Sequence, residues 1–462
     1  MPDLQHGATL LRFNRLYFTI SYMDILIIIL QFFLSLSILV VLHEGGHYAA
    51  ARWFNTRVEK FYLFFDPWFS IAKKKIGDTE YGIGWLPLGG YVKISGMVDE
   101  SMDLEQMKQP AEPWEFRSKP AWQRLIIMLG GVTVNFILGF LIFGLILVVW
   151  GDSYIPSSVV KEGIYVDSIG RSIGLQDGDK ILALGGAPFE KFDSRKLIRS
   201  IVIDGISSIK VQRNGSEVDI PIDKKWVTEL SSHKNKGVLI FGPRMPLEVQ
   251  KLVKGSPAEL AGIQPGDRII SINDEPVKYL HEFSQKIHPE PQKSYVVTVL
   301  RNGNPKRLEI TTDSKGKFGM YWKMLDVKKE KYSIWKALPM GVTRGIKFLK
   351  DQLVGFKKMF SGEIKASESL GGFATIAQLF PTTWDWEQFW KITAVLSLIL
   401  GFMNLLPIPA LDGGHVMFLL YEMVSGKKPS DKVMEVTTMI GMILLFGLLL
   451  YANGMDIIRY FK

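Results

Sequence analysis

Four apolar stretches, separated by longer polar segments, dominate the pattern of hydrophobic and polar positions along the chain. They cover Ile25–Leu42, Leu125–Trp150, Ile392–Leu406 and Val436–Tyr451. A helix of about 20 apolar residues crosses the hydrocarbon core of a bilayer, so the pattern predicts membrane helices. A cleaved signal peptide is disfavoured for the first stretch, because no small-residue cleavage site follows it and its helical pattern continues to Phe54. The predicted spans are residues 23–54, 121–150, 389–410 and 432–455, preceded by an N-terminal extension at 1–22.

Lys and Arg residues gather after the first span, before the second, and between the third and fourth. They are Arg52, Arg57, Lys60, Arg117, Lys119, Arg124, Lys427, Lys428 and Lys432. Because cytoplasmic loops carry an excess of positive charge, these loops are expected in the cytoplasm. Both termini and the region 151–390 are then expected on the opposite side, although Arg12 and Arg15 oppose this orientation.

An internal repeat lies between the second and third spans. The sequence GLQDGDKI begins at Gly174, and GIQPGDRI begins at Gly262, 88 residues later. Each copy predicts a short helix, a turn and a strand of β-branched residues. The second copy resembles a PDZ domain and the first a weaker one, so PDZ-like domains are expected at 155–240 and 241–325. Such domains bind extended peptides at a sheet edge, but the pair could equally act as spacers or size filters.

Apolar residues recur at spacings of three or four between Trp335 and Phe360, while Lys and Arg residues fill the other faces. This pattern predicts an amphipathic helical region within 330–385, either as one helix or as two helices separated near Gly345 and Gly355. Such a helix is suited to a membrane surface. Packing against the PDZ-like pair is the alternative.

The first span runs into the sequence His43-Glu44-Gly45-Gly46-His47. Residues four apart lie on one face of a helix, so His43 and His47 can bind one Zn²⁺, and Glu44 is placed to act as general base. A cluster of polar side chains reaching for the membrane interface is the alternative. That alternative does not explain the spacing, nor two glycines inside a helix.

A second polar cluster, NLLPIPALDGGH, interrupts the third stretch. Its apolar run stops before Asn404, and Pro407 and Pro409 end the helix, which a membrane tolerates where the chain lines a polar cavity. Asp412 is the natural third zinc ligand, with a helix cap as its alternative role. Asn404 could donate its amide to a carbonyl or a developing oxyanion. His415 could support a ligand or, less simply, bind the metal itself.

HExxH on a first span, NxxPxPxLDG on a third and PDZ-like repeats between the second and third resemble the site-2 protease family of intramembrane zinc metalloproteases. Two tandem copies in a four-span chain are most similar to the RseP type of Gram-negative bacteria, and the resemblance covers nearly the whole chain. It implies one catalytic Zn²⁺. It also implies the following site: ligands His43, His47 and Asp412, general base Glu44, and substrate or transition-state contact Asn404.

The resemblance further implies an enzyme of the bacterial inner membrane that acts in regulated intramembrane proteolysis. Its substrates would be single-span membrane proteins already trimmed outside, typically anti-sigma factors of the envelope stress response, and remnant signal peptides. The active site would lie toward the cytoplasmic side of the membrane, and the PDZ-like domains would lie in the periplasm.

A β-rich segment is expected at 55–120, after the first span. Part of it, YGIGWLPLGGYVKISG, begins at Tyr81 and is punctuated by glycines. A helical substrate must become extended before its peptide bonds can be attacked, and an exposed strand edge could hold it. In the family, a membrane-embedded β-loop is given this task, which makes Gly82 and Gly84 the candidate substrate strand. A purely structural hairpin is the alternative.

Composition narrows the remaining classes. Cysteine is absent, so disulfides, thiolate metal sites and Cys nucleophiles are excluded. A metal site would have to use His and carboxylate ligands, and there are only seven His. The net charge of +9 suits anionic lipid, and no nucleic-acid partner is expected. A membrane-tethered protease of the soluble type would carry HExxH in a polar domain, and a PDZ scaffold or chaperone would need neither Glu44 nor Asp412. We therefore expect a polytopic α-helical membrane protein: four transmembrane helices, two tandem PDZ-like α+β domains and a membrane-associated β-hairpin region.

Overall fold

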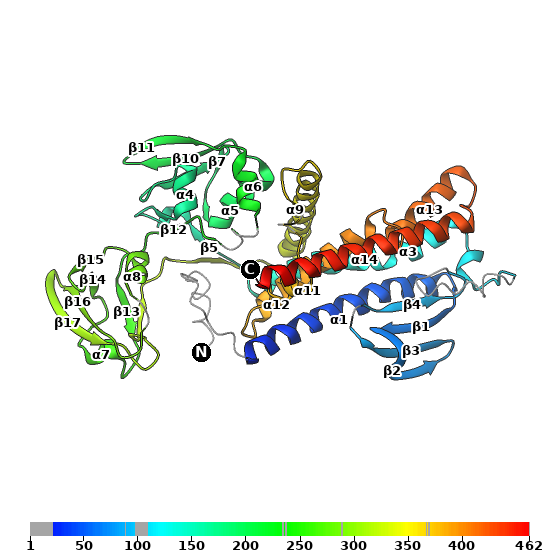
Figure 1. The fold of residues 1–462 in the computed structure, drawn as a ribbon, viewed down its shortest axis with the longest axis horizontal. Helices are drawn as coiled ribbons and strands as arrows, with labels where there is room; N and C mark the ends of the chain where they lie inside the picture. The colour runs from blue at the N-terminus through cyan, green and yellow to red at the C-terminus, as the bar shows by residue number, and fades with distance from the viewer. Residues whose placement is uncertain are drawn as a thin grey trace. The chain divides into compact units, whose positions relative to one another are not determined.

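The computed structural model describes residues 22–87, 89–97, 110–232, 235, 238–287, 290–365, 367 and 370–461. Residues 1–21 of the expected N-terminal extension therefore lie outside the described part of the chain. The described residues belong to two compact units, coloured along the chain in Figure 1. We call them the membrane unit and the repeat unit. The first comprises Ile20–Asp152, Lys331–Lys357 and Ser369–Lys462, and the second Ser153–Glu330 with Lys358–Glu368.

Four helices of the described chain are long and apolar enough to cross a membrane, as the sequence predicts. They are α1 (Tyr22–Trp53), α3 (Ala121–Val149), α12 (Trp386–Leu405) and α14 (Asp431–Phe461). Long uninterrupted runs of apolar residues form them, because a helix satisfies its own backbone hydrogen bonds where no water is present. The chain is a membrane protein.

Polar side chains inside these apolar helices mark the contacts between them. Ser35 of α1 hydrogen bonds with Thr393 of α12 across 2.9 Å. The amide of Gln31 donates to the backbone oxygen of Pro381 at 2.8 Å, and the hydroxyl of Ser397 donates to the backbone oxygen of Asn135 in α3 at 2.7 Å. A polar group in an apolar medium is costly unless it is paired, so these bonds fix which faces of α1, α3 and α12 meet.

The third span ends where its prolines predict. Helix α12 stops at Leu405, and a new helix, α13 (Asp412–Ser425), begins with Asp412 in its first turn. Between them Ala410 adopts a left-handed backbone conformation with φ +87°. Helix α13 is held to α3 by an ion pair between Arg124 and Glu422, 2.5 Å apart and largely buried. The turn thus delivers Asp412 from a separate helix, which the sequence analysis did not distinguish.

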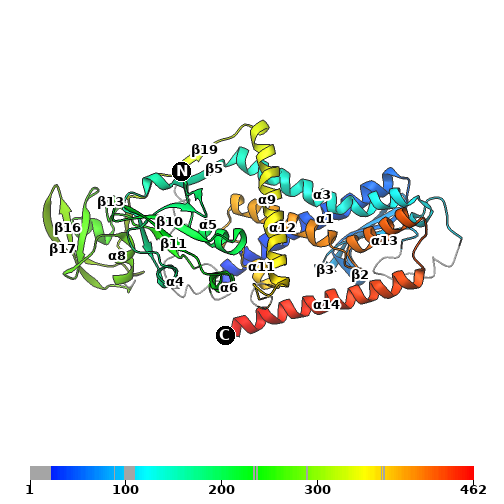
Figure 2. The ribbon, with the colours of Figure 1, turned by 90° about the horizontal axis from the view of Figure 1, so that it is seen from above.

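The β-rich segment forms one sheet of the membrane unit. Its strands are β1 (Val58–Leu63), β2 (Phe65–Ile76), β3 (Thr79–Leu86) and β4 (Tyr91–Ile94), in the order β2-β3-β1-β4. Strands β1 and β3 are parallel neighbours, whereas the other pairs are antiparallel. The sheet packs on the C-terminal part of α1 through Ala50, Ala51, Val58 and Ile94, as Figures 1 and 2 show. Among the described strands, β4 is the edge nearest α1.

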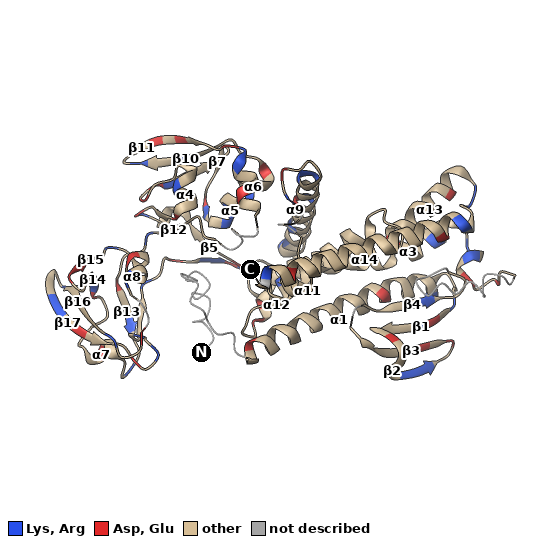
Figure 3. Ribbon diagram, in the orientation of Figure 1, with Lys and Arg blue, Asp and Glu red and all other residues tan. Residues whose placement is uncertain are grey.

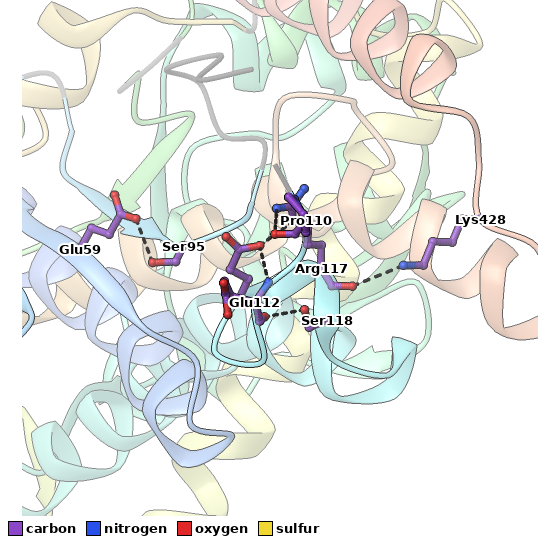
Figure 4. Close-up of polar contacts among 8 residues, drawn as sticks. Glu59, Ser95, Pro110, Glu112, Arg117, Ser118 and Lys428 are labelled. Carbon is purple, nitrogen blue, oxygen red and sulfur yellow. Dashed lines mark hydrogen bonds and ion pairs between the residues drawn. The ribbon is translucent and has the colours of Figure 1, made fainter. Parts of the chain in front are cut away.

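The basic loops of the membrane unit meet at one end. The Lys119 ammonium donates to the backbone oxygen of Asn55 at 3.3 Å, and that of Lys428 donates to the backbone oxygen of Arg117 at 3.4 Å (Figure 4). The middle of the long helices is almost free of charge (Figure 3). All three basic loops therefore share the end that carries the sheet.

The predicted amphipathic region contains a single long helix, α9 (Ile334–Phe360), followed by the short helix α11 (Phe373–Ala377). The helix is not divided at Gly345 or Gly355. A Cβ atom at Gly341 would lie 2.6 Å from the backbone oxygen of Phe140 in α3. The small-residue face of α9 therefore packs on α3.

The repeat unit contains two similar modules, each around its own apolar core. The first includes β6 (Ile164–Val166), α4 (Ser168–Ile173), β7 (Lys180–Leu184), α5 (Ser194–Arg199), β10 (Ser208–Arg213), β11 (Ser216–Pro221) and β12 (Phe241–Pro243). The second includes β13 (Val249–Leu252), α7 (Pro257–Leu260), β14 (Arg268–Ile272), α8 (Leu280–Lys286), β16 (Ser294–Arg301), β17 (Asn304–Thr311) and β18 (Met320–Trp322). Strand β12 pairs with β6, so the first module extends to Pro243, past the expected boundary at residue 240.

An Arg–Asp ion pair occurs at equivalent positions in the two modules. Arg213 donates to Asp179 at 2.8 Å in the first, and Arg301 donates to Asp267 at 2.6 Å in the second. Both Asp residues follow the repeated glycine of the turn, and both are almost fully buried. The repeat seen in the sequence therefore extends to the tertiary contacts.

Candidate metal centre

Two histidines one turn apart on α1 point to the same place. The Nε2 atoms of His43 and His47 are 3.3 Å apart, and the residues are only 7% and 6% exposed. Four residues advance a helix by slightly more than one turn, so both rings leave the same face. The two histidines of the HExxH motif therefore lie side by side on one face of the helix, as the sequence predicts.

Asp412 completes the group from α13. Its Oδ2 atom lies 3.3 Å from Nε2 of His43 and 3.3 Å from Nε2 of His47. The three candidate ligand atoms therefore form a triangle with equal sides. No other group of His, Cys, Asp or Glu with this compactness occurs among the described residues.

The triangle fits zinc. In a tetrahedral site with metal–ligand bonds of about 2.0–2.1 Å, ligand atoms are separated by about 3.3 Å, which is the spacing found here. The Oδ2 atom of Asp412 is also buried without a hydrogen-bond partner, and a metal ion would satisfy it. Two imidazoles and one carboxylate with a fourth position left for water is a donor set of catalytic zinc sites.

Helix α3 holds both histidines from outside, a contribution that the sequence analysis missed. The Nδ1 atom of His47 lies 2.9 Å from the backbone oxygen of Ile127, and Nδ1 of His43 lies 2.9 Å from the amide nitrogen of Asn135. Gly131 lies between them, where a Cβ atom would lie 2.7 Å from the ring of His43. The sequence signal for this contribution was an asparagine and a pair of glycines inside a run of 26 residues without a charge.

A cavity of about 870 Å³ opens beside the triangle. Its lining includes His43, Glu44 and His47 of α1, residues Gly89–Ile94 at strand β4, Asn404 and Asp412, and Thr438 and Leu445 of α14. The Glu44 side chain lies against the start of β4, because a Cβ atom at Gly90 would be 3.5 Å from its Cγ atom. The cavity therefore lies between a carboxylate and the edge of a sheet.

The expected substrate strand needs a correction. Gly82 and Gly84 belong to β3, which pairs with β1 on one side and β2 on the other. Gly82 has a partner on each side, Tyr62 of β1 and Lys73 of β2, and Gly84 is paired with Ser70 of β2, so this strand lies inside the sheet and is not an edge. The edge that faces Glu44 is β4. Which strand lies at the edge depends on the order of the strands in the sheet, which includes a parallel pair. The sequence pattern does not reveal that order.

The two remaining candidates lie at the same cavity. The amide nitrogen of Asn404 is 3.2 Å from Nε2 of His43, at the end of α12. His415 lines the cavity from the first turn of α13 but is not part of the compact triangle. The structure therefore brings together all the predicted residues except the two glycines of β3.

Comparison with known proteins agrees with this geometry. The model of peptidase family M50 matches residues 31–448. The chain is 28% identical over 449 residues to the regulator of sigma-E protease RseP of Escherichia coli, covering 91% of this chain and 97% of that protein. It is also 28% identical to the regulator of sigma E protease of Haemophilus influenzae, covering 93% and 98%. A Neisseria meningitidis protein that is named as a zinc metalloprotease is 29% identical, and the match covers 93% of this chain and 99% of that protein.

The family match spans both polar clusters, the sheet and the repeats. A zinc-compatible triangle of two histidines and an aspartate, with a glutamate beside it, is the arrangement expected of a metal-dependent peptidase. The chain belongs to peptidase family M50, the site-2 protease family, and is a zinc metalloprotease of the membrane.

Proposed function

We propose that the protein is a zinc-dependent intramembrane endopeptidase that hydrolyses the transmembrane segments of single-span proteins. The observation that carries this proposal is the position of the ligand triangle, which is buried between helices that are long enough to span a bilayer. A protease acting on soluble peptides would expose its metal to water. The adjacent cavity and the edge of β4 offer room for an extended substrate.

In this proposal His43, His47 and Asp412 hold the zinc ion. When bound, zinc lowers the pKa of a coordinated water toward about 7 and polarises the carbonyl to be attacked. Glu44 accepts the proton of the attacking water and then donates it to the nitrogen of the leaving amine. Glu44 is placed for both transfers because it lines the cavity one residue from His43.

Strand β4 and Asn404 would orient the substrate. Peptide bonds in a helix are internally hydrogen-bonded, so the cleaved segment must be extended, and it can then add to the edge of β4. Asn404 would donate its amide to the oxygen of the attacked carbonyl, where negative charge develops. The support is its position, 3.2 Å from a ligand nitrogen and at the end of a broken helix.

The two modules of the repeat unit would act as PDZ-like domains that screen substrates before they reach the cavity. The support is the repeated helix, turn and strand pattern, with an ion pair at equivalent positions. Screening could use peptide binding or simple size exclusion. Deletion of residues 155–315 should then permit cleavage of bulkier, untrimmed substrates, and unchanged selectivity would contradict the proposal.

The biological setting follows by analogy with the relatives. Two of them are named as regulators of sigma E, which supports a role in an envelope stress response with an anti-sigma factor or remnant signal peptides as substrates. The basic loops meet at the end of the membrane unit that carries the sheet. The positive-inside rule would place that end, and the active site near it, toward the cytoplasm of a bacterial inner membrane, and the repeat unit in the periplasm.

A reporter assay tests the proposed activity. Purified protein is incubated in bilayers with a single transmembrane segment, and with a soluble peptide of the same sequence, for wild type and Glu44→Gln. We expect cleavage of the membrane-embedded reporter by wild type only, with zinc retained in Glu44→Gln because the ligands are intact. Equal cleavage of the soluble peptide, or full activity of Glu44→Gln, would contradict the proposal.

A further inference from the structure

Both ring nitrogens of His43 face the nitrogen of an asparagine amide. Nδ1 is 2.9 Å from Nδ2 of Asn135, and Nε2 is 3.2 Å from Nδ2 of Asn404. A neutral imidazole has one N–H donor and one acceptor. Neither tautomer can accept hydrogen bonds from two amides, so at least one of these amides must change its contact with the ring when the site is in use.

The ligand triangle decides which amide turns. Nε2 of His43 is the corner of the triangle, 3.3 Å from both other ligand atoms, so it must offer its lone pair to the metal. The proton of the ring is then on Nδ1, which needs an acceptor. The fully buried Asn135 carries that acceptor, because its Oδ1 atom has no hydrogen-bond partner. The oxygen and nitrogen of an amide exchange places by a half-turn of the side chain with almost no change in shape.

We propose that Asn135 is a positioning residue of the metal centre, which presents Oδ1 to the Nδ1 proton of His43 and thereby fixes the ring in its metal-binding tautomer. This inference rests on the ligand role proposed for His43. Helix α3 then supplies an acceptor to each histidine, the backbone oxygen of Ile127 for His47 and the side chain of Asn135 for His43. Such outer hydrogen bonds orient histidine ligands and raise their basicity.

The placement of Asn135 supports this assignment. Ile127, Gly131 and Asn135 are spaced four residues apart, so they form one row along α3 that faces the two rings. The backbone oxygen of Asn135 is separately engaged by Ser397, so helix packing does not use the side-chain oxygen. Ser397→Ala therefore offers a matched control on the same residue.

The role of Asn135 can be tested by measuring zinc affinity. Zinc affinity of the full-length protein is determined by competition with a chromophoric chelator for wild type, Asn135→Leu, Asn135→Asp and Ser397→Ala. Leucine removes the acceptor at similar volume, whereas aspartate keeps an acceptor oxygen. We expect about 10- to 100-fold weaker zinc binding by Asn135→Leu, and near wild-type affinity for Asn135→Asp and Ser397→Ala. The visible spectrum of the cobalt-substituted protein should change for Asn135→Leu and be restored in Asn135→Asp.

Two results would overturn the inference: wild-type zinc affinity in Asn135→Leu, or equal weakening in Asn135→Leu and Asn135→Asp. If leucine prevents folding, Asn135→Ala removes the same acceptor and is compared with Asn135→Asp in its place. The variant Asp412→Ala distinguishes a wrong ligand set from a wrong role for Asn135. Undiminished zinc affinity in that variant would refute the ligand set itself, whereas loss of affinity there with no effect at Asn135 would refute only the positioning role.

Discussion

The backbones of Gly46 in α1 and Gly130 in α3 lie in direct contact. A Cβ atom at Gly130 would lie 2.5 Å from the backbone oxygen of Gly46, and a Cβ atom at Gly46 would collide with the backbone oxygen of Gly130. No side chain separates the two helices at this level, which is adjacent to His47. The close approach places the backbone oxygen of Ile127 and the side chain of Asn135 within hydrogen-bond reach of the histidines.

Substitution of Gly46 should therefore disrupt the metal centre. Gly46→Val forces the two backbones apart, and we expect loss of stoichiometric zinc and a lower unfolding temperature of the membrane unit. The neighbouring Gly45→Ala is the matched control, since its Cβ meets nothing within 4 Å and alanine favours a helix by about 1 kcal/mol. Elemental analysis and thermal unfolding in detergent compare the two. Full zinc content in Gly46→Val would contradict the role of this contact.

Zinc should stabilise the folded membrane unit. A ligand that binds only the folded state adds about 2.7 kcal/mol at 100 times its dissociation constant, and zinc would relieve the unpartnered Oδ2 of Asp412. We expect chelation to lower the unfolding temperature of wild type, and readdition of zinc to restore it. Asp412→Asn removes an anionic ligand and should show no zinc-dependent shift. A similar shift in both proteins would mean that zinc acts elsewhere.

The edge of β4 can be tested at Val92, which lines the cavity together with Glu44. Val92→Pro removes a backbone N–H and disrupts this strand, so we expect loss of reporter cleavage while zinc remains bound. Val92→Ala keeps the N–H and serves as the control, with cleavage at least ten times faster than Val92→Pro. Cleavage rates and zinc content are measured on the same preparations. Equal rates in the two variants would remove β4 from the proposed substrate site.

The ion pair of the second repeat module should contribute strongly to its stability. Arg301 and Asp267 are 2.6 Å apart, with side chains 15% and 1% exposed, and removal of the Asp267 charge leaves Arg301 without its ionic partner. We expect Asp267→Asn to speed hydrogen exchange in β14 and β16 of the full-length protein. The exposed pair Arg307–Asp274 provides the control, because Asp274→Asn should change stability by less than about 1 kcal/mol.

The same pair predicts a dependence on pH. Burial favours the neutral form of Asp267, but hydrogen bonds from Arg301 and the backbone of Gln264 outweigh burial and hold its pKa below the ordinary 3.8. A lowered folded-state pKa means that the stabilisation is complete above about pH 4 and is lost as the pH falls through the folded-state value. Hydrogen exchange in β14 should accelerate below pH 4 in wild type. Asp267→Asn should lack this contribution, and the same acid response in both would refute it.

Much of the metal centre could be predicted because its determinants are local. The positions of His43, Glu44 and His47 follow from the geometry of one helix turn, and Asp412 follows a pair of prolines that must end a helix. An apolar run of spanning length needs no tertiary information to be recognised. These features depend on distances of a few residues along the chain.

The contributions that were missed depend on contacts between distant segments. Asn135 looks like an isolated polar residue in a membrane helix until α3 is placed against α1. Gly82 and Gly84 look like part of an exposed strand until their strand, β3, is placed between its parallel neighbour β1 and its antiparallel neighbour β2. The break between α12 and α13 could be predicted from Pro407 and Pro409, but the ion pair between Arg124 and Glu422 that joins α13 to α3 links residues 298 positions apart in the sequence.

The triangle of ligands joins a helix near the start of the chain to one near its end. During synthesis, the two histidines enter the membrane long before the ribosome reaches the codon for Asp412. A nascent or truncated chain that stops earlier carries only two of the three metal-binding groups, so it cannot assemble the site. Assembly of the proposed site therefore has to wait until the segment that contains Asp412 has been synthesised and inserted beside the two histidines.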